Sequence, residues 1–369
     1  MQIDASPGLV TGFTLGLDPD GRENVVVVIK RTYAFPSAPD RPCTLADVPE
    51  GLATADTFWG APGFSSPRDE SDFAPRKPYC DVLVEAVAHA PGGRLARRVP
   101  TGLRLGNLSK QIDVVGDRVW QEAGARPTIS EATPFNLMPI TYDRAFGGVD
   151  ALDPEDDPPP AYAKNPVGRG WHQPGNRGLL DGQPLPNTEQ PGRPVTLPWE
   201  HHAPMSYGPL GRGWPERLRH GGTYDQNWID NVFPFLPADF DPRYHQAAPP
   251  DQQMPAPIGG ELVELHNLTP EGYTAFPLPS ADMPVLFVRA RAPDVSTQAM
   301  LDTVVIRPAA RQFSLTWRAS LPLTRDIFEV PSCIVGPRSR SYWRARALGK
   351  AYYPSLGALV AQKTAEEVE

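Results

Sequence analysis

The stretch Glu23–Phe35, ENVVVVIKRTYAF, decides the fold class. Valine, isoleucine, threonine and aromatic residues dominate it, and these residue types are enriched in β-strands. Its apolar start, Val25 to Ile29, is continuous instead of alternating, which predicts a strand that is buried on both faces. FTLGL (Phe13–Leu17) precedes it across DPDG (Asp18–Gly21), where proline and glycine occupy turn positions. The sequence therefore predicts an antiparallel hairpin near the start of the chain.

More short strands are predicted on either side of a long middle segment. The first group forms a meander of at least four strands with turn residues between them: DVLVEAVAHA (81–90), LARRVPTGLRLG (95–106), SKQIDVVG (109–116) and RVW (118–120). The second group is ELVELHNL (261–268), PVLFVRARA (284–292), LDTVVIRP (301–308) and FSLTWRASL (313–321). The expected fold is mainly β, as an antiparallel β-sandwich or barrel-like sheets.

Proline is the unusual feature of the composition. The chain has 46 prolines in 369 residues, more than double the usual ~5%. Many lie between Glu131 and Gln253, where no strand or helix periodicity is visible. Tryptophan and tyrosine accompany them, so we expect stiff, ordered, irregular chain instead of disorder. Asp150–Pro160 (DALDPEDDPPP) is the exception, interpreted as a mobile acidic loop in preference to a variable contact surface.

These patterns divide the chain into four parts. Residues 1–130 form an N-terminal antiparallel β region, and residues 131–260 a proline- and aromatic-rich irregular segment packed on the β core. Residues 261–332 supply strands that complete the same domain. Residues 333–369 form a helical tail, because SRSYWRARALGKAYY (339–353) and LGALVAQKTAEE (356–367) have helical character on either side of Pro354.

Charge and cysteine content exclude several classes of protein. A net charge of −8 disfavours a nucleic-acid binder, which requires a positive field. Cys43, Cys80 and Cys333 are far apart and odd in number, so we expect reduced thiols and no zinc site. The start MQIDASPGLV lacks the features of a signal peptide, and the longest apolar run, Val25–Ile29, is too short to span a bilayer. We expect a soluble cytoplasmic protein without cofactor, metal or membrane contact.

The stretch Gly221–Gln253 is the strongest candidate for chemistry. Asp239, Asp241 and His245 have side chains that suit a divalent metal ion. Local structure offers a plainer interpretation, because Asp241 precedes Pro242 in the pattern of a helix N-cap followed by proline at the first helical position. Thr223 with Gln226 fits a capping box for a short helix, with Asp225 in its first turn. We favour these structural roles.

Other catalytic patterns are weaker. Glu189 and the aspartates of the middle segment are potential partners in a carboxylate pair for glycoside hydrolysis, but sequence does not give their separation. WEHH (Trp199–His202) places two histidines side by side, and we expect a solvated loop. GFSSP (Gly63–Pro67) lacks the final glycine of a nucleophile elbow. No catalytic residue is assigned.

Nine blocks of sequence carry a resemblance to a known family. They are ENVVVVIKRTYAF (23–35), KPYCDVLVEAVAHAPGG (77–93), GDRVW (116–120), PITYDRAFGG (139–148), NPVGRGW (165–171), LPNTEQP (185–191), WPERLRHGGTYDQNW (214–228), FPFLPADFDPRYHQAAPPDQQ (233–253) and GGELVELHNLTPEG (259–272). Together, from about residue 10 to residue 330, they resemble a bacterial family long described as a domain of unknown function. Its genes lie beside those of type VI secretion spike proteins and toxic effectors.

The resemblance implies a non-enzymatic adaptor or chaperone that stabilises a cognate effector toxin and helps to load it onto the spike protein or a spike-associated factor. The residues that we expect at an interaction surface are Trp214, Arg217, Tyr224, Trp228, Arg344 and Arg346. For each aromatic residue the competing interpretation is core packing. The basic tail is either a solvated helix or a docking helix for an acidic partner, and an exposed edge strand offers a route for β-addition. The alternative function is a metal- or carboxylate-dependent hydrolase of a glycan or cell-wall substrate that uses Asp239, Asp241 and His245.

Overall fold

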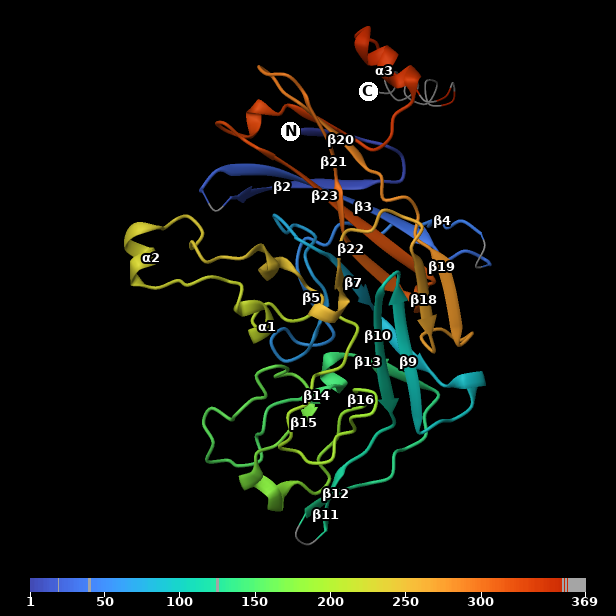
Figure 1. Ribbon diagram of the computed structural model, residues 1–369, viewed down its shortest axis with the longest axis vertical. Coiled ribbons are helices and arrows are strands. Elements are labelled where there is room, and N and C mark those ends of the chain that lie inside the picture. Colours follow the sequence, from blue (N-terminus) through green and yellow to red (C-terminus); the bar gives the residue numbers. More distant parts are fainter. Residues whose placement is uncertain (19, 39–40, 124–125, 354, 356, 358–369) are drawn as a thin grey trace, which may run out of the picture.

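Three open β-sheets build the body of the protein, which confirms the expectation of a mainly β fold and favours a sandwich over a barrel (Figure 1). The computed structural model describes residues 1–18, 20–38, 41–123, 126–353, 355 and 357. The largest sheet contains, in spatial order, β17 (Gln253–Met254), β7 (Cys80–Val84), β22 (Met300–Arg307), β23 (Gln312–Pro322), β3 (Glu23–Ala34) and β2 (Val10–Leu17), with β4 (Thr44–Leu45) beside β3.

Two smaller sheets complete the sandwich. One contains β16 (Thr188–Glu189), β10 (Leu108–Val115), β9 (Arg98–Leu105), β18 (Leu262–His266) and β19 (Tyr273–Pro277). The other contains β1 (Gln2–Ala5), β24 (Ser332–Val335), β20 (Pro284–Val288) and β21 (Val295–Gln298). Isolated pairs join β5 (Thr57–Phe58) to β6 (Pro67–Asp69), β8 (Ala86–His89) to β13 (Leu137–Ile140), β11 (Trp120–Ala123) to β12 (Arg126–Ile129) and β14 (Phe146–Gly147) to β15 (Arg169–Gly170).

One hydrophobic core joins all three sheets. It includes Val27 of β3 and Trp317 of β23 from the largest sheet, Leu103 of β9 and Phe287 of β20. The predicted hairpin is present, since β2 and β3 pair from Val10 opposite Lys30 to Leu17 opposite Glu23. Residues 25 to 29 are all buried, as their unbroken apolar run predicts. The sandwich therefore grows around the stretch that indicated it.

Irregular chain covers the second face of the largest sheet. There Asp81 of β7 accepts hydrogen bonds from Lys77 Nζ (2.8 Å), Gln246 Nε2 (2.6 Å) and the Ala247 amide (2.8 Å). Asp81 is fully buried, so these donors supply the partners that a desolvated carboxylate requires. The contacts fasten the end of the long irregular segment to the sheet.

The expected meander is only partly correct. β9 and β10 form an antiparallel hairpin, but β7 pairs in parallel with β22, more than 200 residues later in the chain. β8 pairs with β13 instead of with β9. Turn residues report where the chain reverses, whereas they do not report which distant strand fills the neighbouring position.

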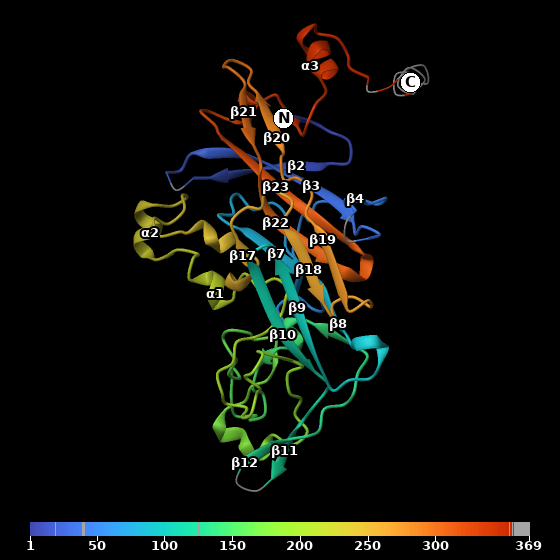
Figure 2. The same ribbon diagram turned by 45° about the vertical axis from the view of Figure 1, so that its right-hand side comes forward.

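The middle segment divides into a lobe and a covering layer. Trp120, Phe146, Tyr162, Leu180, Leu185 and Val195 form a second small core. This core belongs to a lobe below the sandwich that also contains β11, β12 and the 3-10 helix η3 (Pro174–Leu179) (Figures 1 and 2). Residues 206–253 instead pack beside the largest sheet and carry helices α1 (Pro215–Leu218) and α2 (Gln226–Asn231). Most of the segment has irregular structure, and only part of it packs on the β core.

The C-terminal tail begins later than expected. β24 carries the sheet to Val335, across the boundary expected at residue 332, and pairs in parallel with β1. Helix α3 (Arg340–Ala347) then confirms the first predicted tail helix. Most of the second, 356–367, lies outside the described residues.

Candidate functional site

The six residues expected at an interaction surface are divided between interior and surface. Trp214 and Arg217 are buried, which corrects their assignment to a contact surface. Tyr224 is exposed and Trp228 is partly exposed, both on or beside α2. Arg344 and Arg346 are exposed on α3. The six residues therefore belong to three separate places: the interior, the region of α2 and the basic helix α3.

Arg217 acts as an anchor. Its Nε and Nη2 donate to the Tyr244 carbonyl (3.0 and 2.9 Å), its Nη1 donates to the Leu210 carbonyl (3.1 Å), and Nη2 also contacts Glu70 Oε1 (2.7 Å). The planar fork of a guanidinium suits this set of acceptors. Trp214 packs edge-on against Tyr142, with ring centroids 5.1 Å apart. Both side chains hold the base of the chain that carries α2.

We call residues 222–240 the aromatic arm. It projects from the side of the sandwich and carries α2, as both views show (Figures 1 and 2). Tyr224 is 54% exposed and Phe233 66% exposed, and Ile229 and Phe235 are also exposed. Large apolar side chains that cluster on a solvent-exposed surface are typical of a protein-interaction site. The arm is therefore the leading candidate site.

Contacts within the arm order these rings. Trp228 lies at the centre, with Tyr224 and Phe233 edge-on to it at centroid distances of 4.8 and 5.5 Å. The Trp228 indole N–H donates to the Phe235 carbonyl (2.9 Å). Such edge-to-face pairs contribute beyond simple burial. The rings therefore form a preorganised cluster with one side open to solvent.

Two aspartates brace the arm. Asp225 is the N-cap of α2 and accepts from the Trp228 amide (2.9 Å). Asp239 accepts from the Thr223 amide (2.9 Å) and from the Thr223 hydroxyl (2.7 Å), which ties the two ends of the arm together. Thr223 is therefore not the cap of a capping box, because Asp225 occupies the N-cap position of α2.

Asp241 has the capping role that was expected. It precedes the 3-10 helix η4 (Pro242–His245) and accepts from the Arg243 amide (2.8 Å), while its other oxygen accepts from Arg243 Nε (2.7 Å). The hydrogen bond from the Arg243 side chain is the main reason that the pKa of Asp241 lies below its ordinary value. Across the described part of the chain, no three His, Cys, Asp or Glu side chains are grouped so as to hold a metal ion.

His245 is partly buried. Its ring contacts Phe240 and Tyr244, with centroids 5.7 and 5.6 Å away, and its Nδ1 has no hydrogen-bond partner. Burial and the positive charges of Arg212 and Arg217 lower the pKa of His245 to about 4. The ring is therefore neutral at neutral pH. These contacts indicate a packing role for His245.

The polar residues of the lobe also have structural partners. Glu189 is buried and accepts from Arg98 Nη2 (2.8 Å), Arg118 Nη2 (2.9 Å) and the Val195 amide (3.2 Å). This arrangement satisfies both of its oxygens. Glu189 therefore forms an ion-pair junction between the lobe and β9.

Two loop expectations in the lobe need correction. Asp150, expected in a mobile loop, is buried and contacts His172 Nδ1 (2.9 Å), the Gln173 amide (2.8 Å) and Asn176 Nδ2 (2.8 Å). His202, expected in a solvated loop, is buried with its Nε2 2.9 Å from Glu200 Oε2. In both cases hydrogen-bond partners offset the cost of burial, and those of Asp150 lie 22 to 26 residues away in the chain.

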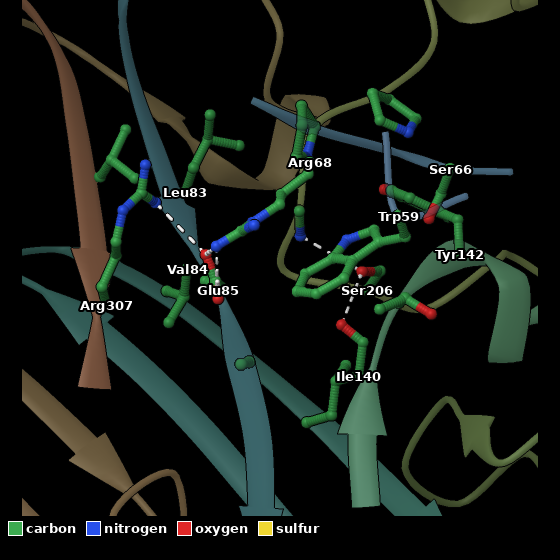
Figure 3. A pocket seen from close by; sticks show the side chains of 16 residues that line it. Trp59, Ser66, Arg68, Leu83, Val84, Glu85, Ile140, Tyr142, Ser206 and Arg307 are labelled. Carbon is green, nitrogen blue, oxygen red and sulfur yellow. Dashed lines mark hydrogen bonds and ion pairs between the residues drawn. The ribbon is translucent and has the colours of Figure 1, made fainter. Parts of the chain in front are cut away.

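The hollow in Figure 3 is small. It has a volume of about 20 Å³, room for little more than one water molecule, and lies between Trp59, Glu85 and Tyr142. Arg68 and Arg307 both reach Glu85, at 3.1 and 3.6 Å, and Figure 3 shows the two guanidinium groups directed at this carboxylate. Arg307 also pairs with Glu50 (2.8 Å) and Asp69 (2.6 Å), so both arginines of the hollow have carboxylate partners, which is typical of a structural network.

The cysteines are not arranged for nucleophilic chemistry. All three are free thiols, and burial raises the pKa of Cys43 to about 11 and that of Cys333 to about 12. Burial also raises the pKa of Cys80 well above its ordinary value. The reactive thiolate form is therefore suppressed at neutral pH.

Helix α3 forms a separate basic surface. Tyr342 and Arg338 both contact Asp4 of β1 (2.5 Å each), and Ser339 caps the helix through the Tyr342 amide (3.2 Å). Arg344 and Arg346 are exposed, together with Trp343 and Leu348. The helix is docked through one side and presents arginine and apolar side chains on the other.

The sequence interpretation missed Ile229, Phe233 and Phe235 as members of the exposed cluster. A signal is present, because Pro234 and Pro237 lie within FPFLP (233–237) and leave its apolar residues without a periodic element to bury them. Their exposure follows from that interruption.

No described helix has the length and apolar character needed to cross a bilayer. In comparisons with known proteins, a model of the family described as "Uncharacterized protein conserved in bacteria (DUF2169)" matches residues 20–318. No curated protein and no solved structure matches the chain.

Proposed function

We propose, from the premise that the chain belongs to the uncharacterized bacterial family DUF2169, that this protein is a non-enzymatic adaptor of type VI secretion. In this proposal it binds and stabilises a cognate effector toxin in the cytoplasm and helps to load it onto the spike protein or a spike-associated factor. The resemblance in the sequence blocks suggests the secretion system. The aromatic arm is the single structural observation that carries the binding role.

The physical case rests on the rigidity of the arm. Exposed rings cost free energy in water, and their burial by a partner recovers about 25 cal/mol per Å². Because Asp225, Asp239 and the Trp228 indole already fix the ring cluster, association does not have to order it. Tyrosine and tryptophan in such a setting are the side chains that dominate binding energy. The arm is suited to gripping another protein.

Two surfaces of opposite charge support two partners. The arm contains Asp225, Asp230 and Asp239 and no basic residue, whereas α3 contains Arg340, Arg344 and Arg346 and no acidic residue. A single partner surface would have to be complementary to both signs. We assign the arm to the effector and α3 to the spike or its associated factor.

The hydrolase alternative receives no support from the contacts of its residues. Asp239 binds Thr223, Asp241 caps η4, and the ring of His245 packs between Phe240 and Tyr244. Each has a role in holding the backbone. These contacts therefore favour the adaptor over the hydrolase.

Co-expression with the toxin encoded beside this gene tests the proposal. We expect the toxin to co-purify with the protein and to accumulate to a higher level in its presence. The double variant Tyr224→Ala, Phe233→Ala removes two exposed rings, and a loss of ~2 kcal/mol per hot-spot ring weakens binding by roughly 30-fold for each.

Phe328→Ala is the matched control. Phe328 is more exposed than either arm residue, at 83%, and lies outside the arm, so its loss should leave co-purification unchanged. If the toxin never associates with the wild-type protein and its abundance ignores the protein, the adaptor proposal is wrong. An equal loss of co-purification in the arm variant and in Phe328→Ala would mean that the arm is not the binding site.

A further inference from the structure

The edge of the largest sheet is open at β2. β2 is the last strand in the sheet order, and its only strand partner among the described residues is β3. Its sequence, VTGFTLGL, contains no charged residue and no proline. Natural proteins usually protect an edge of this length with lysine, proline or a bulge. The β2 edge therefore lacks the features that prevent strand addition.

The hydrogen-bond pattern shows which backbone groups are available. The Asp18 amide donates to the Arg22 carbonyl (2.9 Å), whereas the Leu323 amide donates to the Glu23 carbonyl (2.8 Å). Glu23, opposite Leu17, therefore bonds toward β23 instead of β2. Because antiparallel pairs alternate, the N–H and C=O groups of Thr11, Phe13, Leu15 and Leu17 point away from β3, out of the sheet.

The same residues carry the exposed apolar side chains. Phe13, Leu15 and Leu17 are 39%, 46% and 37% exposed. Phe13 and Leu15 lie opposite Val27 and Val25 in register, so their side chains share the core face of the sheet. This edge extends the apolar core face beyond the layers that cover it.

The other face of β2 is closed. A Cβ atom on Gly12 would lie 2.9 Å from Leu52 Cδ1, and one on Gly16 would lie 2.9 Å from Pro75 Cβ. The covering loop therefore packs directly on the backbone of β2, which holds the strand flat against it. One face of a strand added to this edge would therefore lie beside the covering loop. Its other face would lie beside the exposed apolar side chains of Phe13, Leu15 and Leu17.

The edge is continuous with the aromatic arm. A Cβ on Gly21, at the tip of the β2–β3 turn, would lie 2.7 Å from the Phe235 ring, and Figures 1 and 2 both place this turn next to the arm. The arm is acidic, as described above. A ligand that follows β2 toward Leu17 therefore approaches the Phe235 ring of the acidic arm at that end.

We infer that the β2 edge accepts an extended segment of the partner as an additional strand. This segment has apolar residues at alternate positions, on the side of Phe13, Leu15 and Leu17, and a lysine or arginine at the end that reaches the arm. Main-chain hydrogen bonds would supply affinity and the alternating side chains specificity. This inference rests on the proposed function only in taking the toxin as the natural source of the segment.

The first test uses a synthetic peptide of about nine residues, a usual strand length, that alternates valine and threonine and ends in lysine. We expect it to bind and to protect the amides of Thr11, Phe13, Leu15 and Leu17 from hydrogen exchange. The amides of Gly12, Thr14 and Gly16, already bonded to β3, should not change. Two further peptides carry N-methyl groups at alternate backbone nitrogens, one at the odd positions and the other at the even positions. Only one of these two sets of N–H groups would face β2, so only one of the two peptides should lose binding.

Variants place the contact. Leu15→Lys adds a charge to the edge and should lower the affinity for the peptide by roughly tenfold or more. Phe328→Lys is a substitution at an exposed site outside β2 and should leave this affinity unchanged. Absence of binding at millimolar peptide, equal sensitivity to both methylation patterns, or indifference to Leu15→Lys would overturn the inference. So would a wild-type dimer that Leu15→Lys dissolves, because the edge would then be occupied by a second copy of the chain.

The two proposals fail separately. If the toxin co-purifies equally with wild type and with Leu15→Lys, the edge inference is wrong and the adaptor proposal stands. If the peptide adds to β2 but the toxin never associates, the edge accepts strands and the adaptor proposal is wrong.

Discussion

His245 shows how burial and charge act on one residue. Its ring lies among aromatic side chains, and burial, Arg212 and Arg217 hold its pKa at about 4 instead of the ordinary 6.5. Protonation would add a positive charge to a site that already contains two guanidinium groups. The folded protein therefore resists protonation of this residue where the unfolded chain accepts it.

The sign of the pH dependence follows. Between pH 6.5 and about 4 the unfolded chain carries the extra proton and folded His245 does not, so the free energy of unfolding decreases as pH falls through this window and is fully retained above it. The loss is about 3 kcal/mol in total. His245→Phe keeps an aromatic ring against Phe240 and Tyr244 and should flatten this part of the curve. Urea unfolding at several pH values measures it, and an identical slope in the variant would contradict the assignment.

Sequence indicated residue roles only where the partners are close in the chain. Asp241 before Pro242 was recognised as a cap because the donor, the Arg243 amide, is two residues away. The sequence instead favours a surface position for Arg217, because the acceptors that hold it inside, Glu70 and the Tyr244 carbonyl, lie 147 and 27 residues away in the chain. No local pattern contains that information. The same limit explains why the burial of Asp150 is not predicted, because its partners His172, Gln173 and Asn176 lie 22 to 26 residues away in the chain.

At the scale of elements, the aromatic arm and η4 offer a matched pair of caps. Asp225 caps α2, which carries the ring cluster, and Asp241 caps η4, near the base of the arm. Each carboxylate accepts a backbone amide of the first turn, so the energetic cost of losing either cap is similar. Their consequences for binding should differ because only one cap supports the rings.

Asp225→Ala and Asp241→Ala are each expected to lower the free energy of unfolding by about 1 kcal/mol. Asp225→Ala should also weaken binding of the toxin, because α2 would fray and Trp228 would lose the hydrogen bond from its amide to Asp225. Asp241→Ala should leave binding intact in the folded fraction. Urea unfolding and co-purification measure the two effects. A bound metal in the wild-type protein that Asp241→Ala removes without unfolding would favour a hydrolase instead.

Elements built from local pattern were predicted well, and those that depend on distant pairing were not. The β2–β3 and β9–β10 hairpins follow from turn residues and strand composition. The parallel pairs β7–β22 and β1–β24 join segments more than 200 residues apart, and sequence pattern does not encode such register. β24 was interpreted as tail for this reason, because SCIV (332–335) is short and acquires its partners only in the folded protein.

At the scale of the whole molecule, the two largest hydrophobic cores among the described residues are of unequal size. The large core unites three sheets, whereas the lobe core contains six buried side chains, among them Trp120 and Phe146. Glu189 of β16 connects the two parts, because it pairs with Arg98 of β9 and with Arg118 at the entry to the lobe. We therefore expect the attachment of the lobe to the sandwich to depend in part on this buried carboxylate, beside the pairing of β16 with β10.

Glu189→Ala tests this dependence. It leaves the buried Arg118 guanidinium without its carboxylate, and breaking such a pair costs about 3–5 kcal/mol. Asp113→Ala is the control: it removes the other carboxylate on Arg98, whose side chain is 44% exposed, and should cost about 1 kcal/mol or less.

The loss of stability should be confined to the lobe, because its small core has few buried contacts, whereas β3, β22 and β23 keep their contacts in the variant. Hydrogen exchange in Glu189→Ala is expected to accelerate in the lobe, around Trp120 and Leu180, and to stay slow in the centre of the largest sheet. Uniform acceleration across both parts would mean that the lobe and the sandwich unfold as one unit, and that Glu189 stabilises the whole fold instead of a junction.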